Sequence, residues 1–245
     1  MPTLFSMVSM LKKILNWPKE TETAKTGGEH GNISFSQCGE DLIIKYMAKL
    51  RFLSIPSYLD IGAFNPWYLS NTALFYKEGS RGINIEANPQ LIHKFIKERP
   101  DDINLNIGVG IKDGSMPFYI FEDTTLSTFS ETEATTAQAD YGHKLAATIM
   151  VQVHSINNIV EEYCSGKWPD ILTIDVEGID FEVMQDADFS NSKPKIICAE
   201  TAEYSPIGAG KKRDEYIRLI QDKGYYLYAD TNLNSIFVEN DFWFI

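Results

Sequence analysis

Cysteine is scarce in this sequence, and the few cysteines form no recognisable pattern. Cys38, Cys164 and Cys198 are the three cysteines among 245 residues, and they are widely spaced. An odd number of cysteines at such spacings indicates neither a disulfide framework nor a zinc site. This usage is typical of a reducing compartment, and we therefore predict a cytoplasmic location.

Long apolar runs and large basic clusters are missing as well. No stretch of the sequence is long and apolar enough to span a membrane. The basic clusters are short, Lys12 with Lys13 and Lys211 to Arg213, in a chain whose formal net charge is −12. Because phosphate backbones are bound by clustered lysine and arginine, we expect no nucleic-acid partner.

The first 32 residues differ in character from the rest. Apolar residues from Leu4 to Leu15 recur near helical spacing beside Lys12 and Lys13, which predicts an amphipathic helix over residues 1–17. Residues 18–32 have the composition of a linker. Two interpretations of the helix stay open: it packs on the domain or on a second subunit, or it makes a peripheral contact with a membrane surface.

Residues 33–245 are predicted to form one α/β domain, and the hydrophobic fraction of 44% is enough for its core. Alternating strands and helices predict a mostly parallel sheet with helices on both faces, and the last two strands predict an antiparallel edge. The expected strands are 57–61, 82–86, 103–109, 170–175, 195–200, 224–229 and 235–239. The expected helices are 71–77, 89–97, 156–163 and 214–223.

An insertion at about residues 113–153 interrupts this alternation. Two extra strands, 116–121 and 150–154, flank a polar stretch over 122–147 that is rich in Thr, Ser and Ala. An insertion of this length is often a lid or a loop that binds the acceptor, and a partly ordered surface loop is the other interpretation.

Two residues at predicted strand ends indicate a ligand site, because ligands of parallel sheets bind at the carboxyl ends of the strands. Gly62 follows the first strand and permits a tight turn with close approach of a ligand. Glu86 ends the second strand, roughly 20 residues beyond the glycine, where a carboxylate can bind the two hydroxyls of a ribose. The structural alternative is that Asp60 caps the turn and Glu86 caps the following helix.

The turn does not resemble a dinucleotide site. A pyrophosphate cradle usually needs G-x-G-x-x-G, whereas the larger Phe64 and Asn65 follow Gly62 here. Asp60 fits a cationic ligand better than a phosphate, and a sulfonium with an amino-acid tail meets that requirement. An NAD-linked or nucleotide-sugar oxidoreductase is one alternative, but it would need a phosphate-compatible glycine loop, which this sequence lacks. A non-catalytic interaction domain of the same fold is another alternative.

Several ordered segments resemble FkbM-type methyltransferases. They are S-Q-C-G-E-D at 36–41, Y-L-D-I-G-A at 58–63, Y-L-S-N-T at 68–72, G-I-N-I-E-A-N-P at 82–89 and I-D-V-E-G at 174–178. The resemblance extends from about Ser34 to the C-terminus and implies the class I methyltransferase (Rossmann-like) fold. It further implies S-adenosylmethionine as methyl donor and O-methylation of a hydroxyl on a glycan, sugar or secondary metabolite.

With this resemblance, donor binding is predicted for a set of residues near the strand ends. They are Gln37, Asp60, Gly62, Ala63, Asn65, Ser70, Asn71, Glu86, Ala87, Gly108 and Asp175. The turn around Phe64 is bulkier than the turn that is common in the family.

Candidates for catalysis lie at the ends of the fourth and fifth strands. Methyl transfer to a hydroxyl requires positioning of the acceptor and a carboxylate that takes its proton, for which Asp175 is the first candidate. Glu200 could assist, and so could His143 if the insertion folds over the site. Asp175, Glu177 and Glu200 could instead gather around a divalent cation, or Glu177 and Glu200 could be purely structural.

Overall fold

The computed structural model describes residues 31–176, 178–203 and 210–244. The chain divides into two compact units, Met1–Ile33 and Ser34–Ile245. The predicted N-terminal helix and nearly all of the predicted linker lie outside the described residues. Among the described residues, no helix is long and apolar enough to cross a membrane.

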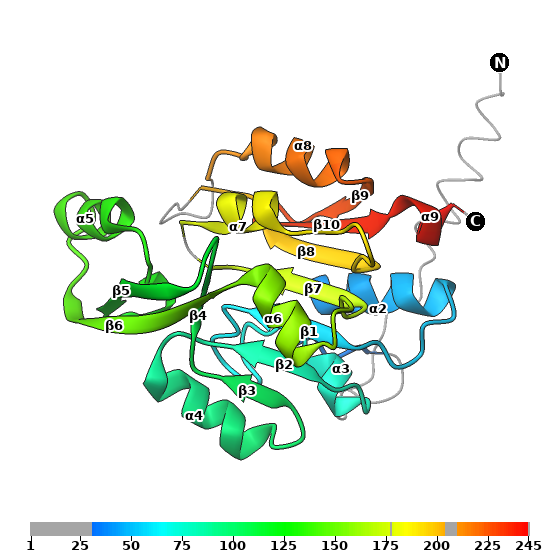
Figure 1. Ribbon diagram of the computed structural model, residues 1–245, viewed down its shortest axis with the longest axis horizontal. Helices are drawn as coiled ribbons and strands as arrows, with labels where there is room; N and C mark the ends of the chain where they lie inside the picture. The colour runs from blue at the N-terminus through cyan, green and yellow to red at the C-terminus, as the bar shows by residue number, and fades with distance from the viewer. Residues whose placement is uncertain (1–30, 177, 204–209, 245) are drawn as a thin grey trace, which may run out of the picture. The chain divides into compact units, whose positions relative to one another are not determined.

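A seven-stranded sheet forms the centre of the unit Ser34–Ile245 (Figure 1). Its strands in spatial order are β3 (Ile103–Leu105), β2 (Gly82–Ile85), β1 (Tyr58–Ile61), β7 (Ile171–Ile174), β8 (Ile196–Glu200), β10 (Asn234–Glu239) and β9 (Tyr225–Asp230). The first five are parallel, and β10 is antiparallel to β8 and β9. The mostly parallel Rossmann-like sheet is confirmed; its antiparallel strand, β10, lies one position in from the edge strand β9.

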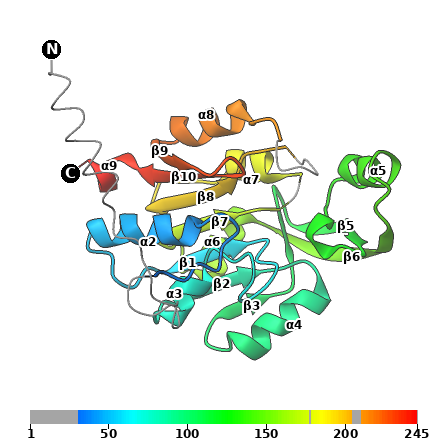
Figure 2. The same cartoon turned by 180° about the vertical axis from the view of Figure 1, so that it is seen from behind.

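Helices cover both faces of this sheet. One face packs against α6 (Ile156–Tyr163), α7 (Asp180–Asp186) and α8 (Asp214–Asp222), and the other against α2 (Glu40–Leu50), α3 (Ala73–Lys77) and the short α9 (Asn240–Trp243). Figure 1 shows α6 in front of the strands, and Figure 2 shows α2 in front when the molecule is seen from behind. The helix α4 (Pro89–Glu98) contacts β3 near the end of the sheet.

The strands are apolar because both faces of the sheet are buried. Successive residues of a strand point to opposite faces. In β1, Leu59 and Ile61 join the core beneath α6 and α7, whereas Tyr58 joins the core beneath α2 and α3. In β8, Ile197 and Cys198 divide in the same way. This double burial explains why the central strands could be recognised as short apolar runs.

The insertion builds a second sheet of its own. Its strands in spatial order are β4 (Gly108–Gly110), β6 (Leu145–Ser155) and β5 (Gly114–Phe121). Between β5 and β6 lie the 3-10 helix η1 (Thr124–Leu126) and α5 (Glu131–Ala139), which the sequence analysis did not predict. The predicted strand 150–154 is only the second half of β6.

The predicted single strand 103–109 is wrong, because the chain leaves the central sheet within it. Residues of β3 pair with β2, and residues of β4 pair with β6 in the second sheet. At the break, Asn106 Nδ2 donates hydrogen bonds to the carbonyl oxygens of Glu86 (2.8 Å) and Ala87 (3.0 Å). The insertion is thereby anchored to the residues that follow β2.

Three further helices among the described residues were not predicted, α2, α7 and α9. α2 begins with Glu40 and Asp41, whose charges are favourable at a helix N-terminus. It ends before Phe52, which has a positive φ of 57°.

Candidate active site

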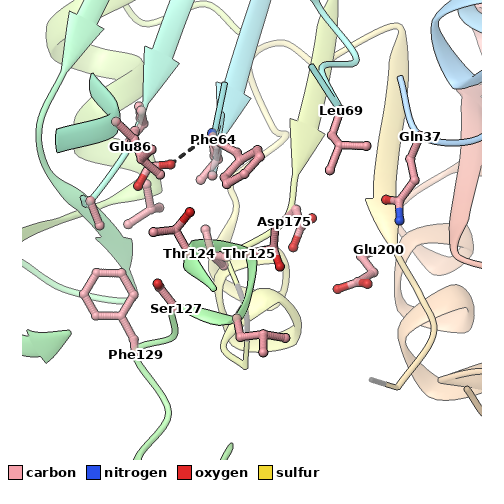
Figure 3. A pocket seen from close by; sticks show the side chains of 18 of the residues that line it. Gln37, Phe64, Leu69, Glu86, Thr124, Thr125, Ser127, Phe129, Asp175 and Glu200 are labelled. Carbon is pink, nitrogen blue, oxygen red and sulfur yellow. Dashed lines mark hydrogen bonds between the residues drawn. The ribbon is translucent and has the colours of Figure 1, made fainter. Parts of the chain in front are cut away.

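A cavity of about 500 Å³ lies at the carboxyl ends of β1, β2, β7 and β8. Between β1 and β7 the order of the strands reverses, which is where open α/β sheets bind ligands. The walls of the cavity also include Gln37 and Cys38 from the segment before α2, residues of the insertion, and the turn between β9 and β10. Figure 3 shows side chains from all four strand ends or their following turns directed into this space.

Gly62 occupies a position that only glycine can fill. Its φ is +76°, and a Cβ atom built there would lie 1.7 Å from the carbonyl oxygen of Asp175. The amides of Gly62 and Ala63 both donate to the carbonyl oxygen of Ile85 at 3.0 Å. The backbones of three strand ends therefore meet at this glycine, and a ligand can approach the peptide directly.

Glu86 is buried in the cavity wall and held in one orientation. Its Oε2 accepts a hydrogen bond from the amide of Phe64 (2.9 Å), which Figure 3 shows, and its Oε1 accepts one from the amide of Asn88 (2.7 Å). Burial raises the pKa of Glu86 to about 7, against the opposing effect of these two amides. Each carboxylate oxygen has a second lone pair available for a ligand.

Asp60 is placed beneath the cavity and does not line it. Its Oδ2 accepts a hydrogen bond from Thr72 Oγ1 (2.5 Å), and that hydroxyl accepts one from Arg99 Nη1 (2.8 Å). Burial raises the pKa of Asp60 to about 6, although Thr72 and Arg99 oppose this shift. Asp60 supports the strand end from the side of α3 and makes no wall of the cavity.

Apart from Asp60, the residues predicted to bind the donor fall into two groups. Gln37, Gly62, Glu86, Ala87, Gly108 and Asp175 line the cavity, whereas Ala63, Asn65, Ser70 and Asn71 do not. The second group organises the turn that follows β1. Asn65 Oδ1 accepts hydrogen bonds from the amides of Trp67 (3.0 Å) and Tyr68 (3.1 Å), and Ser70 Oγ accepts one from Arg99 Nη2 (2.9 Å).

The S-Q-C-G-E-D segment brings Gln37 and Cys38 to the cavity. The carboxylate of Asp41 accepts hydrogen bonds from the hydroxyls of Ser34 (2.6 Å) and Ser36 (2.9 Å). Glu40 accepts one from the amide of Cys38 (2.8 Å), and its other carboxylate oxygen accepts one from Asn234 Nδ2 (3.0 Å). Both acids of the motif are therefore scaffold, and Glu40 ties this segment to the turn before β10.

Asp175 and Glu200, the two carboxyl groups among the predicted catalytic candidates, face the cavity from neighbouring strands (Figure 3). Burial raises the pKa of Asp175 to about 7, and the negative charges of Asp180, Asp60 and Glu86 act in the same direction, while a hydrogen bond with Glu200 opposes them. Burial and the adjacent Asp175 hold the pKa of Glu200 well above its ordinary range. A carboxyl group with a pKa near neutrality is suited to proton transfer at physiological pH.

Sequence reasoning missed the contribution of η1 and the residues after it. Thr124, Thr125, Ser127 and Phe129 all line the cavity. Asp123 Oδ1 caps this short helix by accepting a hydrogen bond from the amide of Thr125 (3.2 Å). The insertion therefore forms one wall of the cavity, whereas the predicted base His143 follows α5 beside Tyr141 and does not line it.

A metal site finds no support in the described part of the chain. Among those residues, no group of three or more His, Cys, Asp or Glu side chains is arranged to hold a metal ion. Glu177, one of the three predicted ligands, lies outside the described residues.

The raised pKa values predict an unusual dependence of stability on pH. Unfolded, Asp60, Glu86 and Asp175 lose their protons near pH 4, whereas the folded protein retains them to about pH 6 or 7. The unfolded state therefore binds fewer protons in this window, and the free energy of unfolding decreases as pH rises, by up to about 1.4 kcal/mol per pH unit for each group. Urea unfolding at pH 5.5 and 7.5 measures this, and Glu86→Gln is expected to reduce the slope. A free energy of unfolding that rises across this range contradicts the assignment.

The strand order, the glycine turn and the acid after β2 define a Rossmann-like α/β protein. The family model described as the methyltransferase FkbM domain matches residues 60–228, more than half of the chain. The chain belongs to the FkbM methyltransferase family.

Solved structures of methyltransferases are similar to the chain, and no curated protein matches it. The chain is 12% identical to methyltransferase FkbM from Methylobacillus flagellatus KT, with a TM-score of 0.44, and the match covers 76% of this chain and 44% of that one. It is also 12% identical to a putative caffeoyl-CoA O-methyltransferase from Staphylococcus aureus, with a TM-score of 0.39, over 97% of this chain and 93% of that one. The chain thus spans less than half the length of the first structure.

Proposed function

We propose that the protein is an S-adenosylmethionine-dependent O-methyltransferase that acts on a hydroxyl of a small-molecule, sugar or glycan acceptor. The observation that carries this proposal is the cavity in which Gly62, Glu86 and Asp175 meet at the reversal of strand order. Membership of the FkbM family supports methyl transfer as the reaction class. The cytoplasmic location remains a prediction from the sequence.

The residues of the cavity fit the chemical groups of the proposed donor. S-adenosylmethionine supplies a methyl group on a positively charged sulfur. Glu86 offers two carboxylate oxygens, fixed by the amides of Phe64 and Asn88, to the two ribose hydroxyls. Gly62 leaves the backbone open to the chain that joins ribose and amino acid. Among the described lining residues there is no lysine or arginine that would favour a phosphate-bearing ligand.

Asp175 is the proposed base for the acceptor. Its side chain lines the cavity, and its buried Oδ1 has no hydrogen-bond partner within the described protein. As the acceptor oxygen bonds to the methyl carbon, Asp175 takes the hydroxyl proton, and the sulfur retains the electron pair of the broken bond. Thr124, Thr125 and Ser127 provide hydroxyls on the wall formed by the insertion, where a polyhydroxylated acceptor could hydrogen-bond.

Calorimetric titration with S-adenosylhomocysteine tests the donor site without knowledge of the acceptor. We expect saturable binding by the wild-type protein and a Kd raised about 10- to 100-fold in Glu86→Ala, because hydrogen bonds to a charged group contribute about 1.5–3 kcal/mol. Glu78→Ala removes an exposed acid that pairs with Lys45 and is the control, with no expected effect. Absence of binding, or tighter binding of NAD, contradicts the proposal.

A further inference from the structure

The cavity is lined by acids and has no basic counterpart among the described residues. Glu86, Asp175 and Glu200 are its titratable carboxyl groups, and none of the described lining residues is lysine, arginine or histidine. Arg213 lies 3.8 Å from Asp180 and Lys212 lies 2.9 Å from Asp230, and neither cation lines the cavity.

Strand register sets these three acids in one row. Ile85, Ile61, Ile174 and Ala199 are successive partners across β2, β1, β7 and β8. The residues that follow them are Glu86, Gly62, Asp175 and Glu200, so the acids flank the glycine on both sides. Neighbouring strands are about 4.8 Å apart, which places each acid within about two strand spacings of the glycine. In Figure 3 Asp175 lies between the Glu86 side of the cavity and Glu200.

The position of the donor's sulfur follows from this row, and this step rests on the proposed function. If Glu86 held the ribose hydroxyls, the adjoining strand end at Gly62 would hold the sulfur, which is bonded to the 5′ carbon of that ribose. Asp175, on the adjoining strand, is then the nearest carboxyl group on the far side. Opposite charges attract each other more strongly beside buried protein groups than in bulk water.

The surroundings of Asp175 leave its charge poorly compensated. The negative charges of Asp180, Asp60 and Glu86 all act on Asp175 and raise its pKa, while a hydrogen bond with Glu200 opposes them. The positive charge of Arg213 lowers the pKa values of Glu200 and Asp180. The same cation also acts on Glu133 of α5, whose negative charge raises the pKa of Glu200. A positively charged ligand offsets this concentration of negative charge, and a neutral ligand of the same shape does not.

We propose that this row of carboxyl groups makes the protein bind S-adenosylmethionine more tightly than S-adenosylhomocysteine, and so favours release of the product. During transfer the sulfur loses its positive charge because it keeps the electron pair of the carbon–sulfur bond. At the same step Asp175 gains the acceptor's proton and loses its negative charge. The positive charge of the sulfur and the negative charge of Asp175 are therefore lost together, and the product keeps only the contacts of its other groups.

Calorimetry with both ligands, in the absence of an acceptor, tests this inference. For the wild-type protein at pH 8 we expect the Kd of S-adenosylmethionine to be about tenfold lower than that of S-adenosylhomocysteine, equivalent to about 1.4 kcal/mol. Sinefungin, which carries an ammonium-bearing carbon in place of the methylated sulfur, is expected to follow S-adenosylmethionine. Titrations in buffers of different ionisation enthalpy are expected to show greater proton release with the cationic ligands.

Variants of the cavity acids test whether their local charge sets the ratio of the two Kd values. A surface variant controls for the net charge of the protein. Asp175→Asn and Glu86→Gln each remove a carboxylate that is ionised at pH 8, and each is expected to bring the ratio of the two Kd values toward one, so either folded variant suffices. Glu78→Gln removes the same charge from the exposed surface and is expected to leave the ratio unchanged. Equal or tighter binding of S-adenosylhomocysteine by the wild type, or a ratio unaffected by both cavity variants, overturns the inference while the proposed function stands. If neither ligand binds, the proposed function fails and the inference fails with it.

Discussion

Replacing Gly62 with alanine is expected to raise the Kd for S-adenosylhomocysteine more than about 100-fold, a loss of about 2.7 kcal/mol or more. The added Cβ would lie 1.7 Å from the carbonyl oxygen of Asp175, which is backbone and cannot rotate away. The ends of β1 and β7 must therefore separate, which displaces Asp175 and the turn that carries Phe64. The positive φ of 76° adds strain of about 1–2 kcal/mol for any residue with a side chain.

Gly79→Ala is the matched control for this variant. Gly79 has a φ of +101°, but a Cβ atom there has no neighbour within 4 Å, and the residue follows α3 outside the cavity. It therefore carries the cost of the backbone conformation without the steric collision. Calorimetry and circular dichroism on both variants measure binding and folding. Wild-type affinity in a folded Gly62→Ala protein contradicts the assigned role of the glycine.

Arg99→Met is expected to lower the free energy of unfolding by about 3–5 kcal/mol, because it leaves buried polar partners without their cation. Arg99 has no exposed surface. Its guanidinium donates to Thr72 Oγ1 (2.8 Å), Ser70 Oγ (2.9 Å), Asn84 Oδ1 (3.3 Å) and the carbonyl oxygen of Pro66. It thus supports much of the turn after β1 from beneath.

Aromatic rings enclose the same guanidinium. Its central carbon lies 5.6 Å from the ring centroid of Trp67, 5.5 Å from that of Tyr76 and 5.3 Å from that of Phe95. Cation–π attraction in such a desolvated site adds to the loss on substitution. Methionine retains much of the apolar volume, so the expected effect isolates the charge and its hydrogen bonds.

Arg81→Met provides the surface comparison. Arg81 pairs with Asp101 at 3.1 Å, and both side chains are about half exposed, so its removal is expected to cost less than about 1 kcal/mol. Urea unfolding of the three proteins gives the comparison directly. A loss for Arg99→Met no larger than that for Arg81→Met contradicts the proposed importance of the buried network.

Local sequence was sufficient to predict a structural element wherever that element depends only on residues that are neighbours along the chain. The apolar runs of β1, β7 and β8 are visible because their side chains are buried on both faces, and the glycine turn is visible because it follows such a run directly. The prediction of one strand over residues 103–109 was wrong because the end of that strand depends on a contact that is not local. The break in that segment depends on Asn106 reaching the carbonyl oxygens after β2, a contact between segments distant in sequence.

The sequence by itself determined the parallel sheet, the glycine turn and the acid at the end of β2, because periodicity and chain reversal are local properties. Only the tertiary structure decided which acids face the ligand. Asp60 turns to the buried network under α3, since strand alternation directs it to the face opposite Leu59 and Ile61. The register of β7 with β8 sets Asp175 beside Glu200, and the folding of the insertion brings Thr124 and Ser127 to the same cavity. These placements follow from strand pairing and long-range packing, which no short stretch of sequence encodes.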